Sequence, residues 1–147
     1  MKGKRIAGAI LLLAVATGAI LYQRDQNARY PLDFARDEVA SASVSTYAET
    51  LTLTEPEELD ALYGALKHMR VVGETKKDGT LYLGAQPYVL KIELRDGGNR
   101  TFFFEQRSGG SAGIGVLSRN GHPDYQVRRL NMAWLWQSIT GEYPKGP

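Results

Sequence analysis

An unbroken apolar segment at the N-terminus constrains the rest of this chain most strongly. Residues 6–22, IAGAILLLAVATGAILY, contain no charged side chain and would measure about 25 Å as a helix, just enough to cross a bilayer. Three basic residues precede this run, whereas Arg24 and Asp25 cancel behind it. The positive-inside rule therefore predicts a cytoplasmic tail over residues 1–5, a single-pass transmembrane signal-anchor helix over 6–22, and a C-terminal domain on the extracytoplasmic side of the cell membrane.

The same segment permits a second interpretation. Ala14-Val15-Ala16 satisfies the small-x-small pattern of a signal-peptide cleavage site. A cut there would secrete a protein beginning at Thr17, but it would leave the apolar stub TGAILY on the mature chain. The uncleaved anchor is therefore favoured, and secretion after cleavage is the alternative.

Charge differs between the two parts of the chain. Residues 1–30 carry five basic side chains against one acid, whereas the remaining residues carry 13 basic and 15 acidic side chains. A slightly acidic domain does not suit a nucleic acid, because affinity for a phosphate backbone depends on clustered Lys and Arg. The absence of cysteine excludes disulfides, thiolate metal sites and a cysteine nucleophile.

Beyond the anchor, the chain is long enough for one domain. Residues 23–37 are polar and broken by Pro31, which predicts a tether, so the domain is expected over 38–147. Hydrophobic alternation and turn residues predict strands at 39–47, 51–53, 70–76, 88–94, 100–106, 114–118 and 125–129, the last as an edge strand. With helices at 55–69 and 132–140, this order predicts an α+β fold, an antiparallel sheet covered on one face by two helices.

Both expected helices have N-terminal capping signals. Thr54 with Glu57 suggests a capping box for the first, and Asn131 is a good N-cap for the second. The first helix carries an apolar stripe at helical spacing, which predicts core packing. Its members are Leu59, Leu62, Tyr63, Leu66 and Met69. In the second helix, Trp134 and Trp136 point to different sides, so only one of them is expected in the core.

A resemblance supports this outline. The run LTLTEPEELDALYGAL, the strand TFFFEQ, and DYQV before a short terminal helix resemble small exported domains of the YhfM-like type from Gram-positive bacteria, over residues 38–140. Those domains are often anchored as lipoproteins, whereas this chain lacks a lipobox cysteine and would rely on its transmembrane helix. Because that group has no settled activity, the resemblance implies no functional residues.

One motif raises the possibility of catalysis. Gly109-Gly110-Ser111-Ala112-Gly113 matches the G-x-S-x-G nucleophile pattern, with His122 and Asp124 downstream as nominal base and orienting acid. A strand pattern follows the serine where the hydrolase elbow needs a helix, and the chain is too short for that fold. A small envelope hydrolase using Ser111 is therefore an alternative, and no catalytic residue is assigned.

Metal and cofactor chemistry find no support in the sequence. His68 has no second ligand at metal-binding spacing. The glycine-rich loop lacks the ending of a P-loop and has no dinucleotide-binding unit around it. We therefore predict neither a metal nor a cofactor.

Basic and aromatic residues near the C-terminus are the best functional indication. If Arg119, Arg128 and Arg129 share an exposed surface with Trp134 or Trp136, that surface would suit an acidic envelope protein or an anionic envelope polymer. The sequence thus favours a membrane-anchored, non-catalytic binding module. An accessory or regulatory subunit of a membrane complex is a further alternative.

Overall fold

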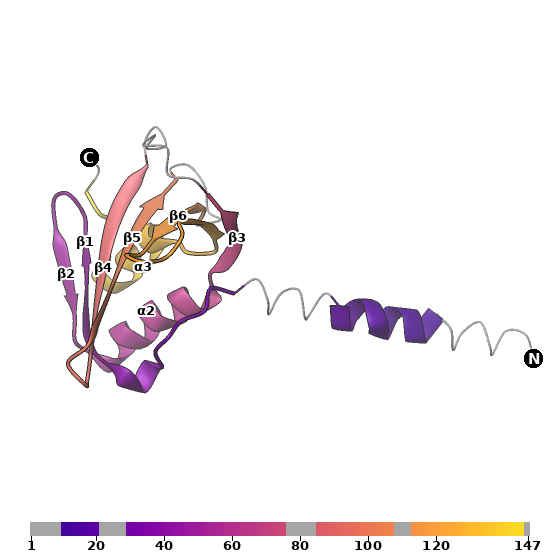
Figure 1. Cartoon of the computed structure of the whole chain (residues 1–147). Coiled ribbons are helices and arrows are strands. Elements are labelled where there is room, and N and C mark those ends of the chain that lie inside the picture. The colour runs from indigo at the N-terminus through magenta and orange to yellow at the C-terminus, as the bar shows by residue number, and fades with distance from the viewer. Residues whose placement is uncertain (1–9, 21–28, 76–84, 108–112, 146–147) are drawn as a thin grey trace, which may run out of the picture.

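The computed structural model describes residues 10–20, 29–75, 85–107 and 113–145 (Figure 1). The elements, in chain order, are η1 (Arg36–Glu38), β1 (Val39–Ser45), β2 (Thr50–Leu53), α2 (Pro56–His68), β3 (Arg70–Glu74), β4 (Gln86–Leu94), β5 (Asn99–Gln106), β6 (Gly115–Ser118), β7 (Tyr125–Arg128) and α3 (Met132–Thr140). The predicted α+β class is confirmed.

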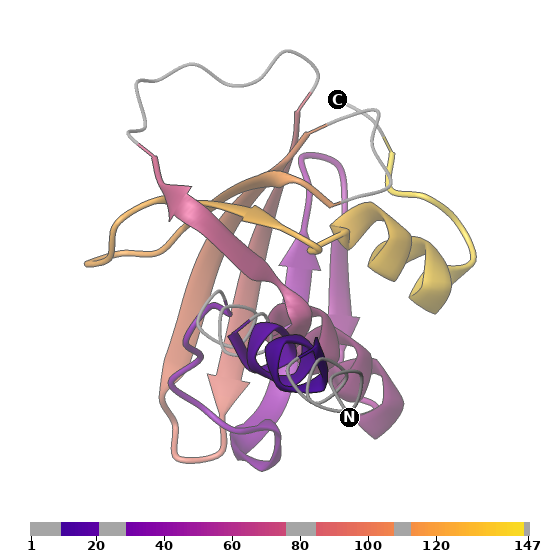
Figure 2. The same ribbon diagram turned by 90° about the vertical axis from the view of Figure 1, so that its right-hand side faces the viewer.

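The strands form one antiparallel sheet in the order β2-β1-β4-β5-β6-β7-β3. Helix α2 leaves β2 at one edge and leads to β3 at the other, so it crosses one face of the curved sheet (Figures 1 and 2). The prediction that residues 125–129 form an edge was wrong, because β3 pairs with β7 and is itself the outer strand. Alternating side chains show which face a strand buries, but not which strand lies beside it.

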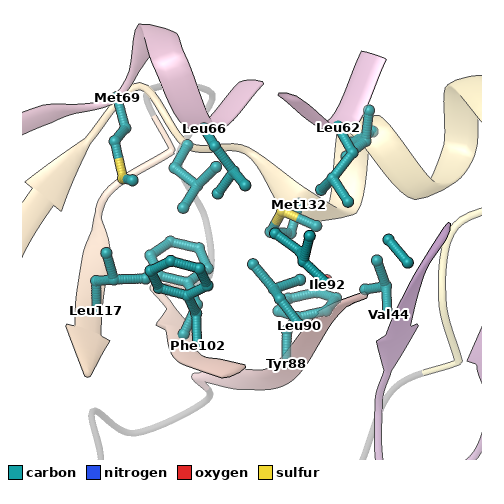
Figure 3. Packing of buried hydrophobic residues seen from close by; sticks show 14 of the residues in the cluster. Val44, Leu62, Leu66, Met69, Tyr88, Leu90, Ile92, Phe102, Leu117 and Met132 are labelled. Atoms are coloured by element: carbon teal, nitrogen blue, oxygen red, sulfur yellow. The ribbon is translucent and has the colours of Figure 1, made fainter. Parts of the chain in front are cut away.

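The core lies between this sheet face and the two helices. In β4, every second side chain from Tyr88 to Leu94 is buried, and Leu90 pairs with Phe102 across the hairpin. Phe102 and Phe104 are fully buried, whereas Phe103 is 40% exposed and points away. Figure 3 shows side chains of α2 packing onto those of β4, β5 and β6. The apolar stripe of α2 therefore covers the sheet as expected.

The helix ends differ slightly from the prediction. Helix α2 is capped by Glu58, whose Oε2 accepts hydrogen bonds from the backbone N–H of Thr54 (3.2 Å) and Glu55 (3.3 Å), so the expected pairing of Thr54 with Glu57 is wrong by one residue. Pro56 occupies the start of the helix, where its missing N–H costs nothing. Helix α3 begins as predicted, with Asn131 Oδ1 accepting from Trp134 N–H at 3.0 Å.

A buried glutamine also holds α3 against the sheet. Gln106 at the end of β5 accepts at Oε1 from the N–H groups of Met132 (2.7 Å) and Ala133 (3.2 Å), and its Nε2 donates to Asn131 Oδ1. Its side chain therefore satisfies helix N–H groups that would otherwise be unpaired in a buried place. We assign Gln106 a structural role.

The folded domain begins earlier than residue 38. Residues 29–38, called the N-terminal strap here, run from an isolated bridge between Arg29 and Arg70 to the end of η1. Tyr30 and Phe34 are 6% and 5% exposed and belong to the core. The predicted tether over 23–37 is therefore wrong from residue 29 onward. Burial of the two aromatic side chains stabilises this segment by more than the cost of ordering the polar residues around them.

The predicted anchor is described only in part. Residues 10–20 are helical, and the Thr17 hydroxyl donates to the Leu13 carbonyl at 2.8 Å. Ile10, Leu12 and other large apolar side chains of this helix are more than half exposed. Within the described residues, no helix has both the length and the apolar character needed to span a membrane.

Candidate functional site

The structure separates the five residues predicted to bind a ligand. Trp136 is 5% exposed and lies with Met132, Leu135 and Ile139 of α3 against Val44 of β1. Trp134, on the same helix, is 60% exposed. The expectation that only one tryptophan enters the core is confirmed, and Trp136 is removed from the candidate surface.

Arg119 also serves the fold. Its guanidinium pairs with the Asp33 carboxylate (NH2 to Oδ2, 3.0 Å) and lies over the Phe102 ring, 5.5 Å from the centroid. Arg100 Nε holds the same carboxylate at 2.9 Å. The Tyr30 ring packs edge-on against those of Phe102 and Tyr125. These contacts fasten the N-terminal strap to the sheet, so Arg119 is not available to a ligand.

The charges of this cluster are fixed by its geometry. Partial burial disfavours a charged Asp33, but hydrogen bonds and attraction from Arg119 and Arg100 outweigh it and lower the pKa of the carboxyl group. Burial likewise works against the charge of Arg119, yet Asp33 raises its pKa above the ordinary value. Burial raises the pKa of Tyr30 as well. A carboxylate held ionised between two arginines is a poor proton acceptor, and the cluster is therefore an ion-pair clamp.

The remaining predicted residues lie where β7 meets α3. Arg128 and Arg129 are exposed, and neither side chain has a hydrogen bond or ion pair to another described residue. Arg129 adopts φ 63°, which makes it the one non-glycine residue with positive φ in the described part of the chain. Trp134 follows in the first turn of α3. We call Arg128, Arg129 and Trp134 the β7–α3 surface.

A tight backbone crossing lies directly after the turn at Arg129. Leu130 enters the core, and its N–H donates to the Gly113 carbonyl at 3.1 Å. Gly113 has φ 59°, and a Cβ atom there would lie 2.6 Å from the Leu130 carbonyl carbon. At Gly115, a Cβ would lie 2.2 Å from the Glu105 carbonyl oxygen. These glycines let segments pass at close range, which gives the last glycine of the G-x-S-x-G pattern a packing role.

The other members of the hydrolase hypothesis lie elsewhere. Ser111 falls outside the described residues. His122 and Asp124 belong to the turn between β6 and β7, at the opposite end of β6 from Gly113. His122 is exposed, and its backbone N–H donates to the Arg119 carbonyl. In the described structure the His122 side chain makes no hydrogen bond to Asp124. No base and orienting acid are therefore assembled in this turn.

A row of arginines escaped the sequence analysis. Arg128 is directly opposite Arg70 in the pairing of β7 with β3, and Arg70 is opposite Arg29 on its other side. We call Arg29, Arg70 and Arg128 the arginine row. The signal was absent from the sequence because the three residues are far apart in the chain, and only the strand register brings them together.

Two further observations limit the chemistry of the described residues. They contain no group of three or more His, Asp or Glu side chains arranged to hold a metal ion. The Tyr88 hydroxyl is buried in the core without a hydrogen-bond partner, and burial raises its pKa to about 12. It lies among apolar side chains (Figure 3), where no substrate reaches it.

Comparison with known protein families, with curated proteins and with solved structures finds no match to this chain.

Proposed function

We propose that this protein is a membrane-anchored, non-catalytic binding module. Residues 6–22 cross the cell membrane once with the N-terminus in the cytoplasm, and the α+β domain stands on the extracytoplasmic side. Its ligand is an acidic envelope protein or an anionic envelope polymer, which the β7–α3 surface contacts.

The sequence and the start of the domain support the anchor together. The uncharged run ends at residue 22, and the fold begins at Arg29. Only residues 23–28 lie between them, a span of at most about 20 Å when fully extended. Such an arrangement suits a domain held close to a membrane surface.

The backbone of Arg129 is the observation that carries the binding proposal. A left-handed conformation costs an L-residue about 1 to 2 kcal/mol, and glycine would adopt it freely. The arginine side chain is exposed and makes no hydrogen bond or ion pair to another described residue. Residues in such conformations cluster at functional sites, and here a second arginine and an exposed tryptophan accompany it.

Photo-crosslinking in intact membranes tests this function. A photoreactive amino acid replaces Trp134 in the full chain, and a matched control places it at Tyr143, which is similarly exposed. We expect a crosslinked product from position 134 that Arg129→Ala reduces and that the control position does not give. Equal products from both positions, or a product insensitive to Arg129→Ala, would contradict a ligand at the β7–α3 surface.

A further inference from the structure

We infer that two copies of this chain pair through the outer edge of β2 and form one continuous sheet. The two β2 strands run antiparallel about a two-fold axis at Leu51, so Thr50 of each copy is opposite Thr52 of the other. The partner is therefore a second copy of this chain. The pairing does not depend on the ligand proposed for the β7–α3 surface.

The two edges of the sheet are protected to different degrees. At the β3 edge, Arg29 bridges to Arg70, and the pairing with β7 shifts register before Gly73, an irregularity that disfavours a further strand. The β2 edge, Thr50–Leu53, contains no proline, lysine or bulge, and in the described structure it pairs with β1 alone. Figure 1 shows β2 as the outermost strand on its side of the sheet. Such an edge is open to another strand.

The free hydrogen-bonding groups of this edge belong to two threonines. The Thr46 N–H donates to the Glu49 carbonyl at 2.8 Å, so these two residues form a hydrogen-bonded pair at the turn. Hydrogen-bonded pairs alternate along an antiparallel ladder, so every second residue of β2, beginning at Leu51, turns its backbone groups to β1. Thr50 and Thr52 consequently point their N–H and carbonyl groups outward, away from β1.

Both ends of this free stretch are closed. Thr54, the next residue whose backbone points outward, already donates its N–H to Glu58 Oε2 at 3.2 Å. At the other end, the hydrogen-bonded turn over residues 46–49 reverses the chain. Within the described structure, the β2 edge therefore offers two N–H and two carbonyl groups, which suits a short partner strand.

A second copy of the same edge fits these groups with none left over. When the two-fold axis passes Leu51, the N–H and carbonyl of Thr50 bond to the carbonyl and N–H of Thr52 in the other copy, and the reverse. The two Leu51 side chains then meet on the face covered by α3, while the threonine side chains pair on the opposite face. Pairing about Thr52 instead would need the Thr54 N–H, which Glu58 already holds.

The surroundings of the edge are complementary in charge in this arrangement. The turn over 46–49 of one copy comes beside residues 53–56 of the other, where α2 begins with an acidic first turn. The backbone N–H of Lys145, an exposed residue, lies 3.4 Å from Glu49 Oε2 and so beside the turn. Each copy therefore brings a lysine to the acidic helix start of the other. Tyr47, 72% exposed on the same turn, gains a contact surface there.

Pairing would also change how the protein binds its ligand. A two-fold axis normal to the sheet keeps the same face of both copies on one side, so two β7–α3 surfaces face the same way. On a repeating polymer, the second contact becomes intramolecular and the avidity rises. This consequence, unlike the pairing itself, rests on the proposed function.

The first experiment maps the register by disulfide formation between full chains in membranes, since the sequence has no cysteine. Thr50→Cys is made in a copy with one epitope tag and Thr52→Cys in a copy with another. Directly opposite residues of a hydrogen-bonded pair have Cα atoms about 5.5 Å apart, a distance that a disulfide spans. After mild oxidation, we expect a product that carries both tags when the two variants are co-expressed.

Either variant alone should give only background product. In this register two copies of position 50, or of position 52, are diagonal neighbours about 7 to 8 Å apart, which is longer than a disulfide normally spans. Val72→Cys on the β3 edge is the matched control for random collisions, because its side chain is 56% exposed and lies at the other side of the sheet.

Thr52→Pro tests the backbone bonds of the pair. The Thr52 N–H points away from β1, so proline removes a bond between copies and none within the domain. We expect loss of co-precipitation between two differently tagged full chains, while the fluorescence of buried Trp136 reports an intact fold. Thr52→Val keeps the N–H and the branched side chain and should retain the pair.

Three results would overturn the inference. Absence of the doubly tagged product, or an equal product from Thr50→Cys alone, would show that the edges do not pair in this register. A pair that survives Thr52→Pro would place the contact between copies elsewhere. Co-precipitation of a different protein in place of a second copy, lost in Thr52→Pro, would assign the β2 edge to another partner. If Thr52→Pro does not fold, the disulfide experiment decides alone, and neither experiment affects the crosslink from position 134.

Discussion

Replacing Arg129 by glycine should stabilise the domain while weakening ligand binding. The left-handed backbone at φ 63° costs arginine about 1 to 2 kcal/mol, which glycine avoids. Glycine in turn gains freedom in the unfolded chain, worth about 0.5 to 1 kcal/mol. The net gain should therefore be about 0.5 to 1 kcal/mol, or a rise in Tm of roughly 2 to 4 °C for a domain of this size.

Arg129→Ala provides the matched control, because it removes the same charge but keeps the unfavourable conformation. Urea unfolding of a fragment from residue 23 onward measures both variants, with the fluorescence of buried Trp136 reporting on the core. Arg129→Gly should be more stable than both the wild type and Arg129→Ala, and both variants should lose the crosslink formed from position 134. Equal stability of the glycine and alanine variants would refute the claim that the backbone at this position is strained.

Three other changes test the fold by urea unfolding. Gly113→Ala should cost about 2 to 5 kcal/mol because the new Cβ meets backbone at 2.6 Å, whereas Gly121→Ala, also at positive φ but in open space, should cost about 1 kcal/mol; similar costs would refute the close crossing. Leu62→Ala should cost about 2 to 5 kcal/mol because the side chain is 2% exposed, and an unchanged midpoint would contradict the buried face of α2. Tyr88→Phe should gain about 1 kcal/mol by removing an unpaired hydroxyl. In the wild type, folding raises the pKa of the Tyr88 hydroxyl from 10.0 to about 12, so the free energy of unfolding is unaffected by its titration below pH 10.0. As the pH rises to about 12, the free energy of unfolding should fall by about 2 to 3 kcal/mol, and Tyr88→Phe should abolish this fall.

The elements of the domain were predictable because each carries a local signal. Alternation along β4 and the N-cap of α3 depend on neighbouring residues only, and both appear as expected. The N-terminal strap was missed because Tyr30 and Phe34 stand among charged residues and a proline, and their burial depends on a partner surface formed by distant strands. A polar, irregular stretch can therefore belong to a core when a few large side chains find a place in it.

The candidate surface was predicted correctly only where it depends on neighbouring residues in the sequence. Exposure of Trp134 and burial of Trp136 follow from helical spacing once one face of α3 meets the sheet. The ion pair that holds Arg119 joins it to Asp33, which is 86 residues away in the chain. The arginine row depends on the register of β3 with β7. Long-range pairings of this kind leave no mark on the local sequence pattern.

Protease access to a C-terminal tag in intact protoplasts tests the central claim most directly. If residues 6–22 anchor the chain with the domain outside, external protease removes the tag while the untreated protein fractionates with membranes after a high-salt wash. Recovery of a soluble, secreted domain that begins at Thr17 would show cleavage in place of anchoring. A tag that stays protected until the cells are lysed would contradict an extracytoplasmic domain altogether.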